Sequence, residues 1–247
     1  MPSKHERMLY GCLSWESDGV LKLNWEQGCS GTSIEDIIFL IIKNNPLIQN
    51  FTYGSLKGKP SNCDMLRAVL IAFKEQVERY SLFIDRKMQS QLRVLCLPNH
   101  GEVSSETLVE LLGKAKIEEL DVSQWELTKD ALETLFEHLS GDLNLKKLCV
   151  AGNYIDDESF QCLSSLVAGT ISLKELDMSS LKNRLMLPTM GKFLDGINEI
   201  NPTLKKISFG DTEITEADWE AFVIRPLREK LPKCQITACL VPKKLQF

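Results

Sequence analysis

The 247-residue sequence has little of what metal-binding, membrane-spanning and secreted proteins require. Its only histidines are His5, His100 and His138, so no pair stands at the i, i+4 spacing of a helical zinc site. The most apolar run covers only residues 37–42, far short of the roughly 18 apolar residues that span a bilayer. No apolar segment of a signal peptide follows the charged residues 1–7. We therefore expect a cytoplasmic chain with no metal site and no membrane partner.

Paired cysteines and excess positive charge are also missing. The eight cysteines are scattered and form no Cys-x-x-Cys pair, which favours free thiols over a disulfide framework or a zinc ribbon. The formal net charge is -5, which is unfavourable for binding the phosphates of nucleic acid. Because hydrophobic residues make up 43% of the chain and charged residues 26%, a folded globular protein is expected.

Catalytic and nucleotide-binding motifs are absent as well. The glycine-containing segment 54–60 faintly resembles a phosphate-binding loop, but Pro60 follows the lysine where a Ser or Thr would hold magnesium. A surface loop is the better interpretation. Since no cluster of acid, base and nucleophile is apparent, we expect no enzyme activity, no cofactor and no small-molecule substrate.

What the sequence does contain is a repeat. Residues 145–155 match the pattern L-x-x-L-x-L-x-x-N-x-L, and the first half of this repeat frame recurs along the chain. Three of the six steps between copies are 28 residues. The copies begin at residues 20, 48, 92, 117, 145, 173 and 204.

Each copy predicts a short parallel strand followed by a helix. Frame positions 1, 4 and 6 should point inward, and apolar residues at helical spacing follow each strand. We expect residues 1–19 to form an N-terminal capping segment with a hairpin strand that turns at Asp18-Gly19. Residues 20–232 should form an α/β solenoid of about seven units, enlarged at 48–91, and residues 233–247 a terminal strand and tail.

The frame resembles the ribonuclease-inhibitor-like class of leucine-rich repeats over residues 20–240. Residues 204–209 and 214–222 are similar to the terminal repeats of NOD-like receptors of the NAIP kind. The resemblance implies a horseshoe with a parallel sheet on its concave side and helices on its convex side. It also implies a non-enzymatic module that recognises a protein partner, with innate immune sensing as one role. Other members of the class imply alternatives: a GTPase activator, an enzyme inhibitor or a cytoskeletal capping domain.

The candidate partner-binding residues lie on the strands and on the loops that follow them. Tyr154 and Trp125 occupy neighbouring loops, with Asp121 and Glu126 beside Trp125, and exposed aromatic side chains are common interface anchors. Trp125 also stands at frame position 9, where the repeat pattern has an asparagine whose side chain hydrogen-bonds neighbouring copies in a ladder. Trp125 could instead replace this ladder asparagine and pack inward. The residues at frame position 5, which include Asp177, are small and polar throughout. Such residues suit a surface that a partner approaches closely, but they are equally common at strand positions that face only solvent.

A GTPase activator would need a catalytic Asn or Arg on such a loop. The candidates are Asn153, Asn183 and Arg184, and the repeat's own ladder hydrogen bond is the favoured explanation of Asn153.

Overall fold

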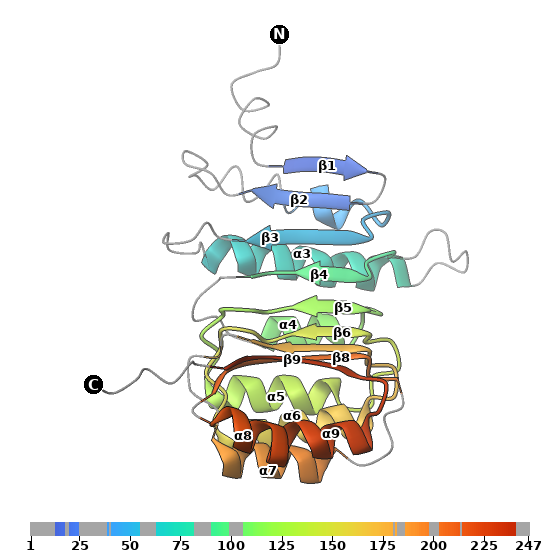
Figure 1. The fold of residues 1–247 in the computed structure, drawn as a ribbon. Coiled ribbons are helices and arrows are strands. Elements are labelled where there is room, and N and C mark those ends of the chain that lie inside the picture. Colours follow the sequence, from blue (N-terminus) through green and yellow to red (C-terminus); the bar gives the residue numbers. More distant parts are fainter. Residues whose placement is uncertain are drawn as a thin grey trace. The chain divides into compact units, whose positions relative to one another are not determined.

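The chain folds into parallel strands and helices and belongs to the α/β class (Figure 1). The computed structural model divides into two compact units, Met1–Trp125 and Glu126–Phe247, a division that falls inside the segment predicted as one solenoid. The residues described are 13–17, 20–24, 39, 41–54, 63–81, 90–98, 106–179, 181, 186–197, 203–212 and 214–240. The side chains of 13–17, 22–24, 54, 63–64, 196, 211–212 and 239–240 are left out of this description.

In the described part of the first unit, five strands are paired in chain order. They are β1 (Leu13–Ser17), β2 (Val20–Asn24), β3 (Asn50–Gly54), β4 (Val94–Cys96) and β5 (Glu119–Asp121). Strand β1 runs antiparallel to β2, as the turn at Asp18-Gly19 predicts, and the remaining pairs are parallel. The helices of this unit include α3 (Cys63–Ser81) and α4 (Glu106–Leu112). The 19-residue α3 lies in the predicted enlarged unit.

The second unit alternates strands and helices. Its strands are β6 (Lys147–Cys149), β7 (Glu175–Met178), β8 (Lys206–Thr212) and β9 (Gln235–Leu240). Its helices are α5 (Lys129–Leu139), α6 (Asp157–Gly169), α7 (Leu187–Gly196), α8 (Glu216–Trp219), η2 (Glu220–Ile224) and α9 (Arg225–Lys230). Within this unit the helices lie on one side of the strands (Figure 1). Strand β9 falls in the predicted terminal segment, whereas the predicted tail at 241–247 lies outside the described residues.

Frame positions 1, 4 and 6 point inward, as predicted. Position 4 of one strand pairs with position 4 of the next, so Leu148 lies opposite Leu176, and Leu176 opposite Ile207. All three inward positions are buried in the six copies that begin at 48, 92, 117, 145, 173 and 204. The repeat therefore sets both the register of the strands and the identity of the core.

The frame of the first copy is wrong by two residues. Leu21, not Leu23, lies opposite Phe51, so this copy begins at 18 rather than 20 and its position 5 is Lys22 rather than Asn24. Side chains two residues apart point to the same face of a strand. Leu21 and Leu23 are both apolar and lie two residues apart, so the apolar pattern alone does not decide which of them lies opposite Phe51.

Aromatic side chains connect the helices of the second unit to its strands. Phe160 of α6 contacts Phe193 of α7 edge to face, at a centroid distance of 5.1 Å. Phe193 contacts Phe209 of β8 at 6.0 Å, and Phe209 contacts Trp219 of α8 at 5.2 Å. Such pairs contribute about 0.5–1.5 kcal/mol each beyond the burial of their surface. They hold successive strand–helix units in one packed core.

Side-chain caps begin three helices of the second unit. Thr128 accepts a hydrogen bond from the backbone N–H of Ala131, and Asp156 accepts one from Ser159. Thr215 caps α8 in the same way. Residues 55–60 of the predicted surface loop lie outside the described residues. None of the helices in the described part of the chain combines the length and apolar composition needed to cross a bilayer.

Candidate partner-binding surfaces

Trp125 is buried and not an exposed anchor. Its side chain has no exposed surface, and its indole N–H donates a hydrogen bond to the backbone carbonyl of Leu97, one copy earlier in the first unit. The adjacent Gln124 and Glu126 have φ angles of 58° and 52°, a left-handed conformation that costs a non-glycine residue on the order of 1–2 kcal/mol. Trp125 therefore takes the inward alternative at position 9, and its assignment as a partner-binding residue is corrected.

Asn153 fills the same frame position in the second unit. It is fully buried, its Oδ1 accepts from the N–H of Leu127 at 3.5 Å, and its Nδ2 donates to the carbonyl of Val150 at 2.9 Å. An amide engaged at both ends and shielded from solvent cannot reach a bound GTPase, so Asn153 is a structural ladder residue. Asn183 and Arg184, the other residues considered for that role, lie outside the described residues.

Tyr154 is 56% exposed although its neighbour Asn153 is completely buried. Two backbone-directed contacts hold its loop: the Leu127–Asn153 hydrogen bond on one side, and on the other the N–H of Gly152, which donates to the carbonyl of Ser179 at 3.0 Å. Within the described part of the chain, no hydrogen bond involves the Tyr154 hydroxyl. This half-covered aromatic side chain therefore extends from a fixed backbone, and its hydroxyl makes no hydrogen bond to a described residue.

Glu126 is exposed and precedes Leu127, whose backbone N–H donates to the side chain of Asn153, the residue before Tyr154. This hydrogen bond joins the segment that contains Glu126 to the loop that contains Tyr154. We call these two segments of the second unit, residues 126–128 and 152–156, the Tyr154 rim.

Asp121 and Asp177 share a local structural role. Each is half-buried, and each carboxylate accepts a hydrogen bond from the N–H two residues ahead, that of Ser123 or Ser179, at 2.9 Å. Such a turn ends the strand and directs the chain toward the loop. Because part of each carboxylate is committed to the backbone, this turn explains Asp at these positions without a partner. Contact of Asp177 with a partner stays a prediction.

A second set of contacts was not foreseen from the sequence. Hydroxyl groups placed just before a strand contact the carbonyls of the preceding copy. Ser172 Oγ lies 3.0 Å from the carbonyl oxygen of Asp142 and 2.8 Å from that of Leu145. Thr203 Oγ1 lies 2.6 and 3.0 Å from the carbonyls of Ile171 and Leu173. The only indication of these contacts in the sequence is a Ser or Thr directly before the first apolar residue of the copies at 173 and 204.

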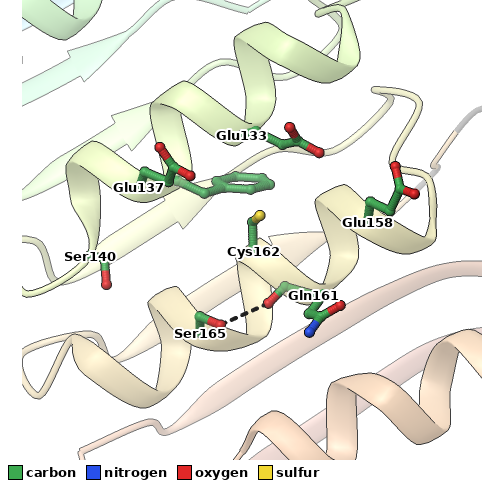
Figure 2. Close-up of a pocket in the computed structure, with 8 residues that line it drawn as sticks. Glu133, Glu137, Ser140, Glu158, Gln161, Cys162 and Ser165 are labelled. Atoms are coloured by element: carbon green, nitrogen blue, oxygen red, sulfur yellow. Dashed lines mark hydrogen bonds between the residues drawn. The ribbon is translucent and has the colours of Figure 1, made fainter.

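A groove of about 380 Å³ lies between α5 and α6 (Figure 2). Its floor contains Cys162, and Figure 2 shows carboxylates projecting from both helices beside it. The Lys129 ammonium pairs with Glu133 at 3.9 Å and with Glu158. The residues that line the groove are Glu133, Phe136, Glu137, Ser140, Glu158, Gln161, Cys162 and Ser165.

The acidic end of this groove has the oxygen donors of a cation site. Carboxylate oxygens of Glu133, Asp156 and Glu158 lie within 4.8 Å of one another. However, Asp156 caps α6, and Lys129 forms ion pairs with the other two groups. These contacts account for the three acidic side chains without a bound cation.

Cys162 lacks the surroundings of a nucleophile. Burial raises the pKa of its thiol, and the carboxylates of Glu133, Glu137 and Asp156 raise it further, against the smaller effect of Lys129. No histidine lines the described groove. The thiol is therefore held in its protonated form, which is the less reactive one.

Comparisons with known proteins do not identify a family for this chain. No protein-family model matches the sequence, and no curated protein matches it either. Among solved structures, it is similar to Leiomodin-1 Actin-Binding Site 2, with 14% identity and a TM-score of 0.45, covering 56% of this chain and 78% of that one. It is also similar to QR15, an aldolase, with 10% identity and a TM-score of 0.26 over 90% of this chain and 89% of that one. Neither score supports an inference about this chain.

Proposed function

We propose that this chain is a cytoplasmic leucine-rich-repeat horseshoe that binds a protein partner and catalyses no reaction of its own. The repeat frame, the parallel register and the buried ladder residue Asn153 support the leucine-rich-repeat assignment. In such solenoids the repeats present extended surfaces to other macromolecules. The similarity of residues 204–209 and 214–222 to NOD-like receptor repeats favours a role in innate immune sensing or regulation.

The observation that carries the proposal is the exposure of Tyr154 on a loop held at both ends. Tyrosine offers a large, amphipathic contact surface and loses few rotamers on binding. Because the backbone of its loop is already fixed by Asn153 and Gly152, little further ordering is needed when a partner docks. The exposed carboxylate of Glu126 adds a polar group at the edge of the same surface.

The test is capture of a partner from cytosolic extract by the intact chain and by Tyr154→Ala. Loss of a central aromatic anchor costs about 2 kcal/mol or more, which corresponds to a roughly 30-fold weaker Kd. Phe222→Ala is the matched control because Phe222 is 57% exposed and lies on η2 rather than on the rim. Both variants should keep the melting temperature of the wild type.

A partner retained by Phe222→Ala and lost by Tyr154→Ala supports the Tyr154 rim as the binding surface. If Tyr154→Ala captures the same partner at the same level, the rim is not the site. If the purified chain accelerates turnover of a substrate or of a GTPase in proportion to its concentration, the non-enzymatic proposal is wrong.

A further inference from the structure

Lysine side chains form a column where the strands of the second unit begin. Lys146, Lys174 and Lys205 occupy frame position 2 in three successive copies. The N–H of Lys174 donates to the carbonyl of Lys146 at 2.7 Å, and the N–H of Lys205 donates to the carbonyl of Lys174 at 2.7 Å. These three lysines therefore occupy successive rungs of the sheet, and adjacent strands lie about 4.8 Å apart.

Frame position 3 adds two more lysines. Lys147 and Lys206 lie on either side of Glu175 in the register of β6, β7 and β8. Positions 2 and 3 of these strands thus carry five lysines and a single carboxylate. We call Lys146, Lys147, Lys174, Lys205 and Lys206 the lysine column.

Three members of the column are exposed and lack a carboxylate partner. Lys174, Lys205 and Lys206 are exposed, and no ion pair involves them within the described ranges. Lysines on the helices of the same unit are placed differently. Lys192 lies 3.6 Å from Asp157, and Lys230 donates to the backbone carbonyls of Leu194 and Ile197.

Like charges on neighbouring strands destabilise a sheet, so the exposed lysines Lys174 and Lys205, on adjacent rungs, repel each other in the isolated chain. Anionic groups laid across β7 and β8 would offset that repulsion. We propose that the lysine column binds an acidic segment of a partner protein, in which Asp or Glu side chains recur along an extended chain. Such a segment would cross the strands at the end opposite to the loop that carries Tyr154. The proposal goes beyond the function argued above and involves different residues.

The outward side chains favour a peptide over a nucleic acid. Outward positions 3 and 5 of the four strands carry no aromatic side chain on which bases could stack; they are Lys147, Cys149, Glu175, Asp177, Lys206, Ser208, Gln235 and Thr237.

The test uses the full chain and a fluorescein-labelled peptide of twelve residues that alternates Glu and Ser, followed by anisotropy at low ionic strength. The triple variant Lys174→Glu, Lys205→Glu, Lys206→Glu reverses the three exposed lysines for which the described ranges show no ion pair. The control variant Lys192→Glu, Arg225→Glu, Arg228→Glu changes the net charge equally, on α7 and α9. A matched peptide of Lys and Ser and a twelve-nucleotide single-stranded DNA complete the set.

We expect the column variant to bind the acidic peptide at least about tenfold more weakly than the wild type, and the control variant to bind within about twofold of it. Tyr154→Ala should bind the acidic peptide as the wild type does, which separates this surface from the Tyr154 rim. If the column variant fails to fold, the substitutions Lys174→Gln, Lys205→Gln, Lys206→Gln replace it, with a proportionally smaller loss.

Three results would overturn the proposal. The wild type could fail to bind the acidic peptide more tightly than the basic one. The two charge variants could lose binding equally, in which case only net charge matters. The DNA could bind more tightly than the peptide and through the same lysines, which would make the column a nucleic-acid surface.

Discussion

Replacing Trp125 by phenylalanine removes a hydrogen bond from the first unit and leaves a smaller apolar ring in its place. The indole N–H that binds the carbonyl of Leu97 is lost. Since both residues are fully buried, that carbonyl is left without this donor, which costs about 1–3 kcal/mol. Trp125→Ala removes the ring as well, and large-to-small substitutions of buried aromatic residues cost about 3–5 kcal/mol.

Urea denaturation followed by far-UV circular dichroism measures these effects, because the loss of an indole also alters fluorescence. With a slope of about 2 kcal/mol/M, Trp125→Phe should lower the midpoint by roughly 0.5–1.5 M, and Trp125→Ala by more. Tyr154→Ala is the control, since substitution of an exposed residue usually changes stability by less than about 0.5 kcal/mol. A Trp125→Phe midpoint equal to that of the wild type would refute the inference that the Leu97 hydrogen bond stabilises the fold.

Two cysteines of the second unit allow further tests. The carboxylate of Glu137 raises the pKa of Cys162, so Glu137→Gln should shift the pH dependence of iodoacetamide labelling at Cys162 to lower pH, as followed by mass spectrometry of the labelled peptides; an equal shift at Cys234 would contradict this cause. Burial raises the pKa of Cys234 from its ordinary 9.0 to about 11. The folded chain keeps a proton that the unfolded chain releases, so the stability from this thiol is present below about pH 9 and lost as the pH rises toward 11. The urea midpoint of the wild type should therefore fall more steeply over that interval than that of Cys234→Ser, and parallel curves would contradict the prediction.

Strand register was predictable because it depends on apolar burial. Leu148, Leu176 and Ile207 lie opposite one another, and a shift of one residue would move every inward side chain to the outer face. A shift of two residues carries no such penalty, which is why the pattern did not distinguish Leu21 from Leu23 as the partner of Phe51.

The site was less predictable because it depends on single backbone conformations. Trp125 and Tyr154 both follow strands and both are aromatic, yet one is fully buried and the other is 56% exposed. Trp125 stands at frame position 9 and Tyr154 at frame position 10, so the two side chains differ by one residue in the repeat. The acceptor of the Trp125 indole, the Leu97 carbonyl, lies 28 residues earlier and is not encoded by any local pattern. The hydrogen bonds of the Ser172 and Thr203 hydroxyls were not predictable for a related reason. Ser and Thr are common in loops whether or not a carbonyl lies within reach.

The contacts between copies have a consequence for how the chain reaches this structure. The ladder and hydroxyl hydrogen bonds of Trp125, Asn153, Ser172 and Thr203 connect residues 26 to 32 positions apart. Each newly folded strand–helix segment therefore finds its binding surface on the segment made just before it. Loops that must close are short, and the entropic cost of closure grows only slowly with their length. During synthesis on the ribosome, such a chain can add one segment at a time without waiting for its carboxyl end.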